Sequence, residues 1–319
     1  MNLSTGKPLG KSKEAIRDVD WKISRLQGGL EVVQEYLKKK GNPYGQIEKW
    51  TTSEAEKKVA PKRKTQLSLN EEIEDFIVTR DNEGGGKYSD GDKLYIAQYT
   101  GSGGLIKQGA QGKGILYEYY TPEDIVRKMW GLAYKYGYHE GKVLEPACGT
   151  GNFLKYSPIE ASVTGYEINP TAVRIVEILY PQVKVYQKPF ETIFFIGNIH
   201  LKGKYAGEKY DLIIGNPPYG DFSGKWAGMG EKQYTGATEY DQYFILRGLE
   251  MLNPGGLLVF IIPSGFLQNA SKYNKIKQRI SQLATLVDAY RLPTGVFNTT
   301  DIGTDIVVFS AIPIGSHEE

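Results

Sequence analysis

The sequence predicts an α/β fold in which an open sheet carries helices on both faces, preceded by a smaller, mainly helical region. Three observations predict it. Apolar runs at 142–145, 162–167 and 210–215 have the length of buried strands, and each ends in glycine or polar residues. Segments with the composition of helices separate several of these runs. Strands that alternate with helices favour a parallel sheet covered on both sides.

The remaining elements of this fold follow in chain order. Residues 183–186 predict a further strand. Asn169-Pro170-Thr171 predicts the start of a helix that runs to about Leu179, because proline is favoured in the first helical turn. The other expected elements are helices over 239–252 and 273–283, and strands over 255–263, 286–290 and 305–310.

The first hundred or so residues have a different character. Apolar residues recur at alternating steps of three and four between 16 and 37, as in the seam of a coiled coil or helical hairpin. Two glycines interrupt this helix, so we expect it to need a packing partner, which is either the rest of this region or a second copy of the chain. The sequence leaves the oligomeric state open. Residues 51–65 are charged and poor in apolar side chains, as expected of a solvated linker.

Asn216-Pro217-Pro218-Tyr219 directly follows the run 210–215 and has the groups that a site for a planar amine needs. An amine on an aromatic ring is a poor nucleophile because its lone pair is delocalised. The Asn216 side chain and the Pro217 backbone each offer a carbonyl that can accept a hydrogen bond from it. The two prolines remove backbone donors, and Tyr219 offers a ring for stacking. Taken alone, the same four residues also fit a simple strand-ending turn.

A glycine turn and an acid precede this motif. The run 142–145 leads into Gly149 and Gly151, which we expect to open a helix and to let the backbone approach a nucleotide-like ligand. The run 162–167 ends in Glu167, 22 residues after Glu145, where a carboxylate can hold both hydroxyls of a ribose. Each signal alone is weak, since a strand-ending Glu often only neighbours a helix cap. The ordered combination of turn, acid and Asn216 to Tyr219 is much more specific.

In this order the three motifs resemble the S-adenosylmethionine-dependent DNA N6-adenine methyltransferases, over roughly residues 115–312. The resemblance implies a Rossmann-like, seven-stranded, mostly parallel sheet, S-adenosylmethionine as cofactor, and an adenine flipped out of DNA as substrate. The catalytic residues that it implies are Asn216, Pro217, Pro218, Tyr219 and Phe297, the last of which would cover the flipped base. The cofactor-binding residues that it implies are Tyr120, Thr121, Pro122, Glu145, Pro146, Ala147, Gly149, Gly151, Asn152, Phe153, Glu167, Ile168, Phe190 and Asn216.

Two features depart from the family pattern. Members commonly place an Asp after the third strand to bind the adenine amine of the cofactor, whereas this chain has Phe190 and Glu191 there. Phe190 could contact the adenine ring, and Glu191 could replace the acid. Members with this motif order also usually carry a target-recognition domain after the last strand, whereas this chain ends at Glu319. We therefore expect DNA as a partner, together with a separate target-recognition domain or subunit.

The domain organisation follows from these boundaries. We place an N-terminal auxiliary region with its linker at 1–112 and the methyltransferase catalytic domain at 113–319. Residues 99–105 resemble the entry to the methylase part of large phage and plasmid methylase-helicase proteins, so the chain is interpreted as the methylase part of something longer. The glycine-rich segment 220–234 is expected to be a mobile loop that orders on DNA, because Lys225, Trp226 and Tyr234 supply charge and stacking surface.

Composition excludes several other classes. The chain has 319 residues, one cysteine, three histidines and a net charge of +2, so we expect no disulfide framework, no metal site and only a local surface for DNA. The lone Cys148 is interpreted as a small residue that fills a tight turn. We expect no membrane-spanning segment and no signal peptide, and hence a cytoplasmic protein of a bacterial cell, encoded by that cell or by a phage or plasmid.

The function predicted from the sequence is transfer of a methyl group from S-adenosylmethionine to N6 of adenine in DNA. Two alternatives stay open. The same four-residue motif serves enzymes that methylate a glutamine amide in a protein or a base amine in RNA. From another class, the chain could be a non-catalytic subunit that binds DNA or cofactor in a restriction-modification or anti-restriction complex.

Overall fold

The computed structural model describes residues 65–83, 85–100, 121–158, 160–201, 205, 207–268, 271–293, 296–297 and 303–312. The expected helix over 16–37, almost all of the linker and the predicted domain boundary at 112–113 lie outside these residues, as does Tyr120. No helix in the described part of the chain combines the length and apolar character that a membrane-spanning segment needs.

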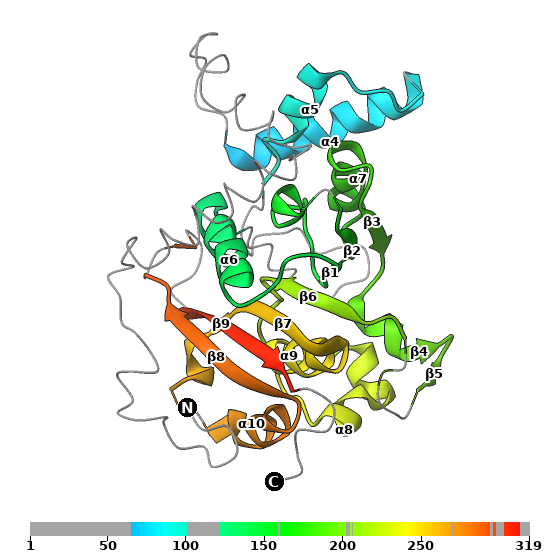
Figure 1. Cartoon of the computed structure of the whole chain (residues 1–319). Coiled ribbons are helices and arrows are strands. Elements are labelled where there is room, and N and C mark those ends of the chain that lie inside the picture. Colours follow the sequence, from blue (N-terminus) through cyan, green and yellow to red (C-terminus); the bar gives the residue numbers. More distant parts are fainter. Residues whose placement is uncertain are drawn as a thin grey trace.

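A seven-stranded sheet with the order β3-β2-β1-β6-β7-β9-β8 forms the centre of the molecule (Figure 1). Its first five strands are mutually parallel, and β9 runs antiparallel to both of its neighbours. The predicted seven-stranded, mostly parallel sheet is therefore confirmed. The strands of this sheet are β1 (Lys142–Glu145), β2 (Ser162–Glu167), β3 (Lys184–Gln187), β6 (Tyr210–Gly215), β7 (Leu252–Pro263), β8 (Ala284–Arg291) and β9 (Thr304–Ala311). A separate hairpin pairs β4 (Phe195–Ile196) with β5 (Ile199–His200).

Helices cover both faces of this sheet. Successive residues of its inner strands point to opposite sides and are apolar, so each face needs a cover of helices. Leu212 and Ile214 of β6 enter one apolar core, which they share with α6 and α7, while Ile213 enters the other, which it shares with α9 and α10. The helices are α4 (Gln66–Glu83), α5 (Asp90–Ile96), α6 (Glu123–Lys135), α7 (Pro170–Leu179), α8 (Lys232–Thr235), α9 (Tyr240–Glu250) and α10 (Asn274–Ser281). The shorter helical turns are η2 (Leu154–Tyr156), η3 (Phe190–Phe194), η4 (Ala227–Glu231), η5 (Ser264–Phe266) and η6 (Ser271–Tyr273).

Local signals explain where two of these helical elements begin or end. Asn169 caps α7 by accepting hydrogen bonds from the backbone amides of Thr171 and Ala172, and Pro170 takes the first helical position, as predicted. The glycine turn differs from the prediction, since it leads into the three-residue η2 and not into an α-helix. Ser157 ends η2 with extended backbone angles, which is the conformation that a following proline, Pro158, imposes.

The described N-terminal residues pack on the catalytic sheet. Asp81 of α4 accepts two hydrogen bonds from Arg174 of α7, at 2.8 Å from Nε and 2.7 Å from Nη2. Ile73 and Ile77 of α4 belong to the same apolar core as α6 and α7. Helix α4 is thus held to α7 by a bidentate ion pair and shares its apolar core.

The segment 220–234 is folded, which differs from the mobile loop expected from the sequence. Phe222 is fully buried and stacks on Tyr243 of α9 with ring centroids 4.4 Å apart. Residues 227–235 form η4 and α8, and Tyr234 lies against the guanidinium groups of Arg247 and Arg279. Burial of the apolar and charged side chains of this segment against α9 and α10 supplies the order that its glycines alone disfavour.

Candidate functional site

Strands β1, β2 and β6 are parallel neighbours, so Glu145, Glu167 and Asn216 meet at one edge of the sheet. A cavity of about 700 Å³ opens there. It brings together fourteen of the residues predicted for the site: Thr121, Glu145, Pro146, Ala147, Gly149, Asn152, Phe153, Glu167, Ile168, Phe190, Asn216, Pro217, Pro218 and Tyr219. This is the place where ligands bind in open α/β sheets, beyond the carboxyl ends of the strands.

Glu167 holds the glycine turn in place. Its carboxylate accepts hydrogen bonds from the backbone amides of Gly149 at 2.8 Å, Ile168 at 2.7 Å and Asn169 at 2.8 Å. Gly149 has a φ of 52°, a left-handed conformation that glycine adopts without a steric penalty. The carboxylate is therefore fixed at the rim of the cavity, and its remaining lone pairs can accept hydrogen bonds from a ligand.

Glu145 is the buried acid of the cavity. It is 2% exposed, and its Oε2 atom has no hydrogen-bond partner among the described residues. Burial raises the pKa of this carboxyl well above its usual range, and the nearby Glu167 carboxylate adds to the effect. A buried carboxyl oxygen without a partner is costly, so the site fits a ligand that brings a cation or a hydrogen-bond donor to it.

Cys148 lies behind the glycine turn. Its thiol sulfur packs so closely on β2 that a Cβ atom added to Gly165 would lie 2.9 Å from it. Burial raises the pKa of the Cys148 thiol well above its usual range, and the carboxylates of Glu145 and Glu167 raise it further. The interpretation of Cys148 as a small residue that fills a tight turn agrees with this packing, and a thiolate nucleophile does not.

Asn216 and Tyr219 are hydrogen-bonded to each other. The Tyr219 hydroxyl donates to the Asn216 side-chain carbonyl at 2.6 Å. Burial raises the pKa of this hydroxyl well above its usual range, so it keeps its proton and remains a donor. The carbonyl that was predicted to accept a bond from a target amine thus has a partner within the chain.

Aromatic side chains form the far wall of the cavity. Phe190 of η3 and Phe244 of α9 lie with ring centroids 5.0 Å apart, and Trp226 packs on Phe195 of β4 at 4.7 Å. Glu191 also lines this region, and burial raises the pKa of its carboxyl to about 7. An aromatic ring and a carboxyl that is about half protonated at neutral pH are groups that can contact the face and edge of a heterocycle.

Three predicted site residues within the described part of the chain do not line the cavity: Pro122, Gly151 and Phe297. Pro122 precedes α6 as its N-cap residue. Gly151 has a φ of 86°, and an added Cβ would lie 2.8 Å from the Tyr180 ring, so this glycine permits close packing below the turn. Phe297 is 7% exposed and lies in the apolar core against which Tyr219 packs. Gly151 and Phe297 are therefore not among the residues that line the cavity in this structure.

The cavity also includes residues that the sequence did not single out, among them Lys188, Tyr240 and Phe244. Tyr240 and Phe244 are four residues apart at the start of α9, so they share one face of that helix. Lys188 directly follows β3, and the end of a parallel strand is the signal that could have identified it. Among the described residues, no group of carboxylate, histidine or cysteine side chains has the arrangement of a metal site.

Comparison with known proteins gives a consistent family. Residues 181–297 match the Eco57I restriction-modification methylase family. Defense against restriction protein B of Escherichia phage P1 is 32% identical over 231 residues, which are 72% of this chain and 9% of that protein. The type II methyltransferase M.TthHB8I of Thermus thermophilus is 33% identical over 165 residues, 46% of this chain and 34% of the enzyme. The chain thus spans less than two thirds of either relative.

Solved structures share the fold. A protein of Listeria monocytogenes assigned as a class I S-adenosylmethionine-dependent methyltransferase superposes with a TM-score of 0.52 at 13% identity, covering 92% of this chain and 90% of that one. A protein of Vibrio vulnificus assigned as the modification subunit of a type I restriction enzyme gives 0.51 at 19% identity, over 79% and 51% of the two chains. Taken together with the family match and the cavity at the edge of the sheet, these similarities establish that the chain contains a methylase domain of the Eco57I restriction-modification type, with S-adenosylmethionine as its cofactor.

Proposed function

We propose that this chain methylates N6 of adenine in DNA, using S-adenosylmethionine and a base flipped out of the duplex. The observation that carries the proposal is the position of Asn216 to Tyr219, which follow β6 and line the same cavity as Glu145, Gly149 and Glu167. This arrangement supports an amine site next to the proposed cofactor site.

The proposed assignment of the cofactor uses groups at the near side of the cavity. S-adenosylmethionine supplies a methyl group on a sulfonium, which is a good leaving group. Glu167 would accept hydrogen bonds from the ribose hydroxyls, and Glu145 would receive the cationic or donor groups of the methionine part. Phe190 would contact the adenine ring, and Glu191 would face its edge in place of the usual Asp.

In the proposed reaction, this chain's own residues orient the amine. Tyr219 would stack on the flipped adenine, and its hydroxyl would leave the Asn216 carbonyl. The Asn216 side chain and the Pro217 carbonyl would accept the two N6 hydrogens and direct the nitrogen lone pair along the line of attack. The new N–C bond forms as the S–C bond breaks, and the alkylated amine then gives its extra proton to water. No strong base is required, because alkylation makes that proton acidic.

We also propose a partner and a cellular location for this chain, on the basis of its relatives. One related structure is assigned as the modification subunit of a type I restriction enzyme. We infer that a separate target-recognition domain or subunit supplies the DNA sequence preference, and that the chain acts in the cytoplasm of a bacterial cell.

Mass spectrometry of nucleosides tests this function. Unmethylated DNA is incubated with the full chain and S-adenosylmethionine, with Asn216→Ala as the control variant. The expected product is N6-methyladenine, formed by the unaltered chain and absent with Asn216→Ala. Methyl transfer that survives in Asn216→Ala would refute the catalytic assignment. Cofactor binding without any product from DNA would favour an RNA or protein amide as substrate, or a non-catalytic subunit.

A further inference from the structure

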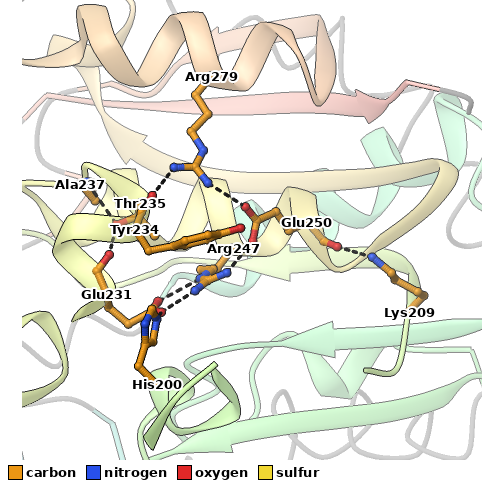
Figure 2. Close-up of polar contacts among 9 residues, drawn as sticks. All are labelled: His200, Lys209, Glu231, Tyr234, Thr235, Ala237, Arg247, Glu250 and Arg279. Atoms are coloured by element: carbon orange, nitrogen blue, oxygen red, sulfur yellow. Dashed lines mark hydrogen bonds and ion pairs between the residues drawn. The ribbon is translucent and has the colours of Figure 1, made fainter. Parts of the chain in front are cut away.

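Behind the aromatic wall of the cavity lies a fully buried ion pair between Glu231 of η4 and Arg247 of α9. Arg247 donates from Nε to Glu231 Oε2 at 2.9 Å and from Nη2 to Oε1, so the contact is bidentate (Figure 2). His200 of β5 reaches the same carboxylate. The pair therefore joins the segment 220–234 to α9 and to the β4-β5 hairpin.

Two aromatic rings enclose the Arg247 guanidinium. Its central carbon lies 3.9 Å from the ring centroid of Phe194 and 4.3 Å from that of Tyr234. Phe194 ends η3, and Tyr234 belongs to α8. The guanidinium thus acts as a rigid spacer between two segments that are 40 residues apart in the chain.

The same three elements supply the aromatic wall of the cavity. Element η3 carries Phe190 in the cavity and Phe194 at the guanidinium. Helix α9 carries Phe244 in the cavity and Arg247 one turn later, while Trp226 lines the cavity just before η4, which ends in Glu231. Each of these segments therefore contributes side chains both to the cavity and to the cluster behind it.

We propose that Glu231 and Arg247 are positioning residues that fix Trp226 relative to Phe244, at the part of the cavity where the target base enters. This rests on the proposed function for the identity of the entering group. A buried ion pair is a poor way to gain stability, because apolar residues of similar volume often serve as well. What the pair does supply is a fixed distance and orientation, since a fork of two hydrogen bonds to one carboxylate admits little variation.

Glu250 provides a matched control. It accepts a hydrogen bond from Arg247 Nη1 at 2.6 Å, and it is also buried, but it lies on α9 and contacts Arg279 of α10. Glu250→Gln removes a buried carboxylate from the same guanidinium and leaves the fork to Glu231 in place. Glu231→Gln breaks the fork with a side chain of nearly the same shape. Glu231→Asp serves as a second variant that keeps the charge and shortens the reach.

Three measurements on the full chain test the proposal. The first is binding of S-adenosylhomocysteine by calorimetry, the second is hydrogen exchange of peptides within 222–235, and the third is steady-state methyl transfer to unmethylated DNA. For Glu231→Gln we expect cofactor-product affinity within about twofold, exchange about tenfold faster, and KM for DNA about tenfold higher with kcat within about threefold. Glu231→Asp should fall between this variant and the unaltered chain, and Glu250→Gln should match the unaltered chain in exchange and KM.

Failure of the positioning role and failure of the proposed function give different results. An unchanged KM in Glu231→Gln, or the same KM rise in Glu250→Gln, would overturn the positioning role, as would a parallel loss of S-adenosylhomocysteine affinity. If the unaltered chain transfers no methyl group to DNA, the proposed function has failed, and hydrogen exchange alone tests the positioning role of the ion pair. Faster exchange in Glu231→Gln and Glu231→Asp but not in Glu250→Gln would then support the positioning role. Equal exchange in all variants would overturn the positioning role.

Discussion

The Tyr219 hydroxyl donates a hydrogen bond of 2.6 Å to the Asn216 side-chain carbonyl, so two residues of one motif satisfy each other in the structure. The carbonyl oxygen has two lone pairs, so a target amine would share this acceptor with the hydroxyl or displace it. In this arrangement the Tyr219 hydroxyl competes for the acceptor that we propose for the target amine.

Replacing Tyr219 by Phe should remove this competition and keep the ring for stacking. A neutral hydrogen bond contributes about 0.5–1.5 kcal/mol, so kcat/KM for DNA should stay equal or rise by up to about tenfold. Tyr219→Ala should instead lower kcat/KM by about tenfold or more, because base stacking contributes about 1–3 kcal/mol. Steady-state kinetics of both variants provide the measurement. A loss in Tyr219→Phe as large as that in Tyr219→Ala would mean that the hydroxyl itself acts in the transition state.

Replacing Glu167 by Ala should weaken binding of S-adenosylmethionine. The change removes the proposed ribose acceptor and also releases the amides of Gly149, Ile168 and Asn169. Hydrogen bonds to a charged group contribute about 1.5–3 kcal/mol, so the dissociation constant should rise by about tenfold to a hundredfold in calorimetry. Glu177→Gln, an exposed change on α7, is the control. Equal affinities for the two variants would remove Glu167 from the cofactor site.

The Glu191 carboxyl should make stability depend on pH. Burial raises its pKa from 4.5 in the unfolded chain to about 7 in the folded protein, with a smaller contribution from Glu231. The folded state therefore holds the proton more tightly, and stability should fall as pH rises from about 4.5 to 7 and then level off. Over this pH interval the free energy of unfolding should fall by about 3 kcal/mol.

Glu191→Gln removes this titration, since the amide stays neutral. The variant should gain stability relative to the unaltered protein between pH 4.5 and pH 8, as measured by thermal unfolding at a series of pH values. Parallel stability curves for the two proteins would show that the carboxyl does not titrate in this range.

Replacing Gly151 by Ala should destabilise the fold more than replacing Gly137 by Ala. Both glycines have positive φ values, 86° and 106°, so both substitutions cost about 1–2 kcal/mol of backbone strain. Only at Gly151 would the new Cβ lie 2.8 Å from a ring, whereas nothing lies within 4 Å of it at Gly137. Overpacking should add about 1–3 kcal/mol to the loss at Gly151, measured by urea unfolding. Equal losses would show that Tyr180 moves aside freely.

Much of the site could be predicted because it depends on strand ends. Glu145, Glu167 and Asn216 each follow an apolar run, and parallel strands bring such positions to one edge without any knowledge of distant contacts. The cap of α7 was predictable for a similar reason, since Asn169 and Pro170 act within one turn of the helix.

The ion pair behind the far wall of the cavity could not be predicted in this way. Glu231 and Arg247 are charged residues 16 positions apart, and charged residues in a glycine-rich segment usually lie in solvent. Only the folded chain shows that each neutralises the other in the interior. The same limitation applies to Phe297, whose segment resembles one that covers the base but whose side chain lies in the apolar core.

Cys148 is the only thiol of the chain, and it is 4% exposed, packed on β2 at the cavity. A maleimide can react with it only when motion of the site exposes the sulfur. The rate of labelling therefore reports how often the cofactor end of the sheet opens, and a ligand that binds there should slow that rate in proportion to its occupancy. A residue that only fills space in the fold thus gives a chemical measure of how often its own binding site opens.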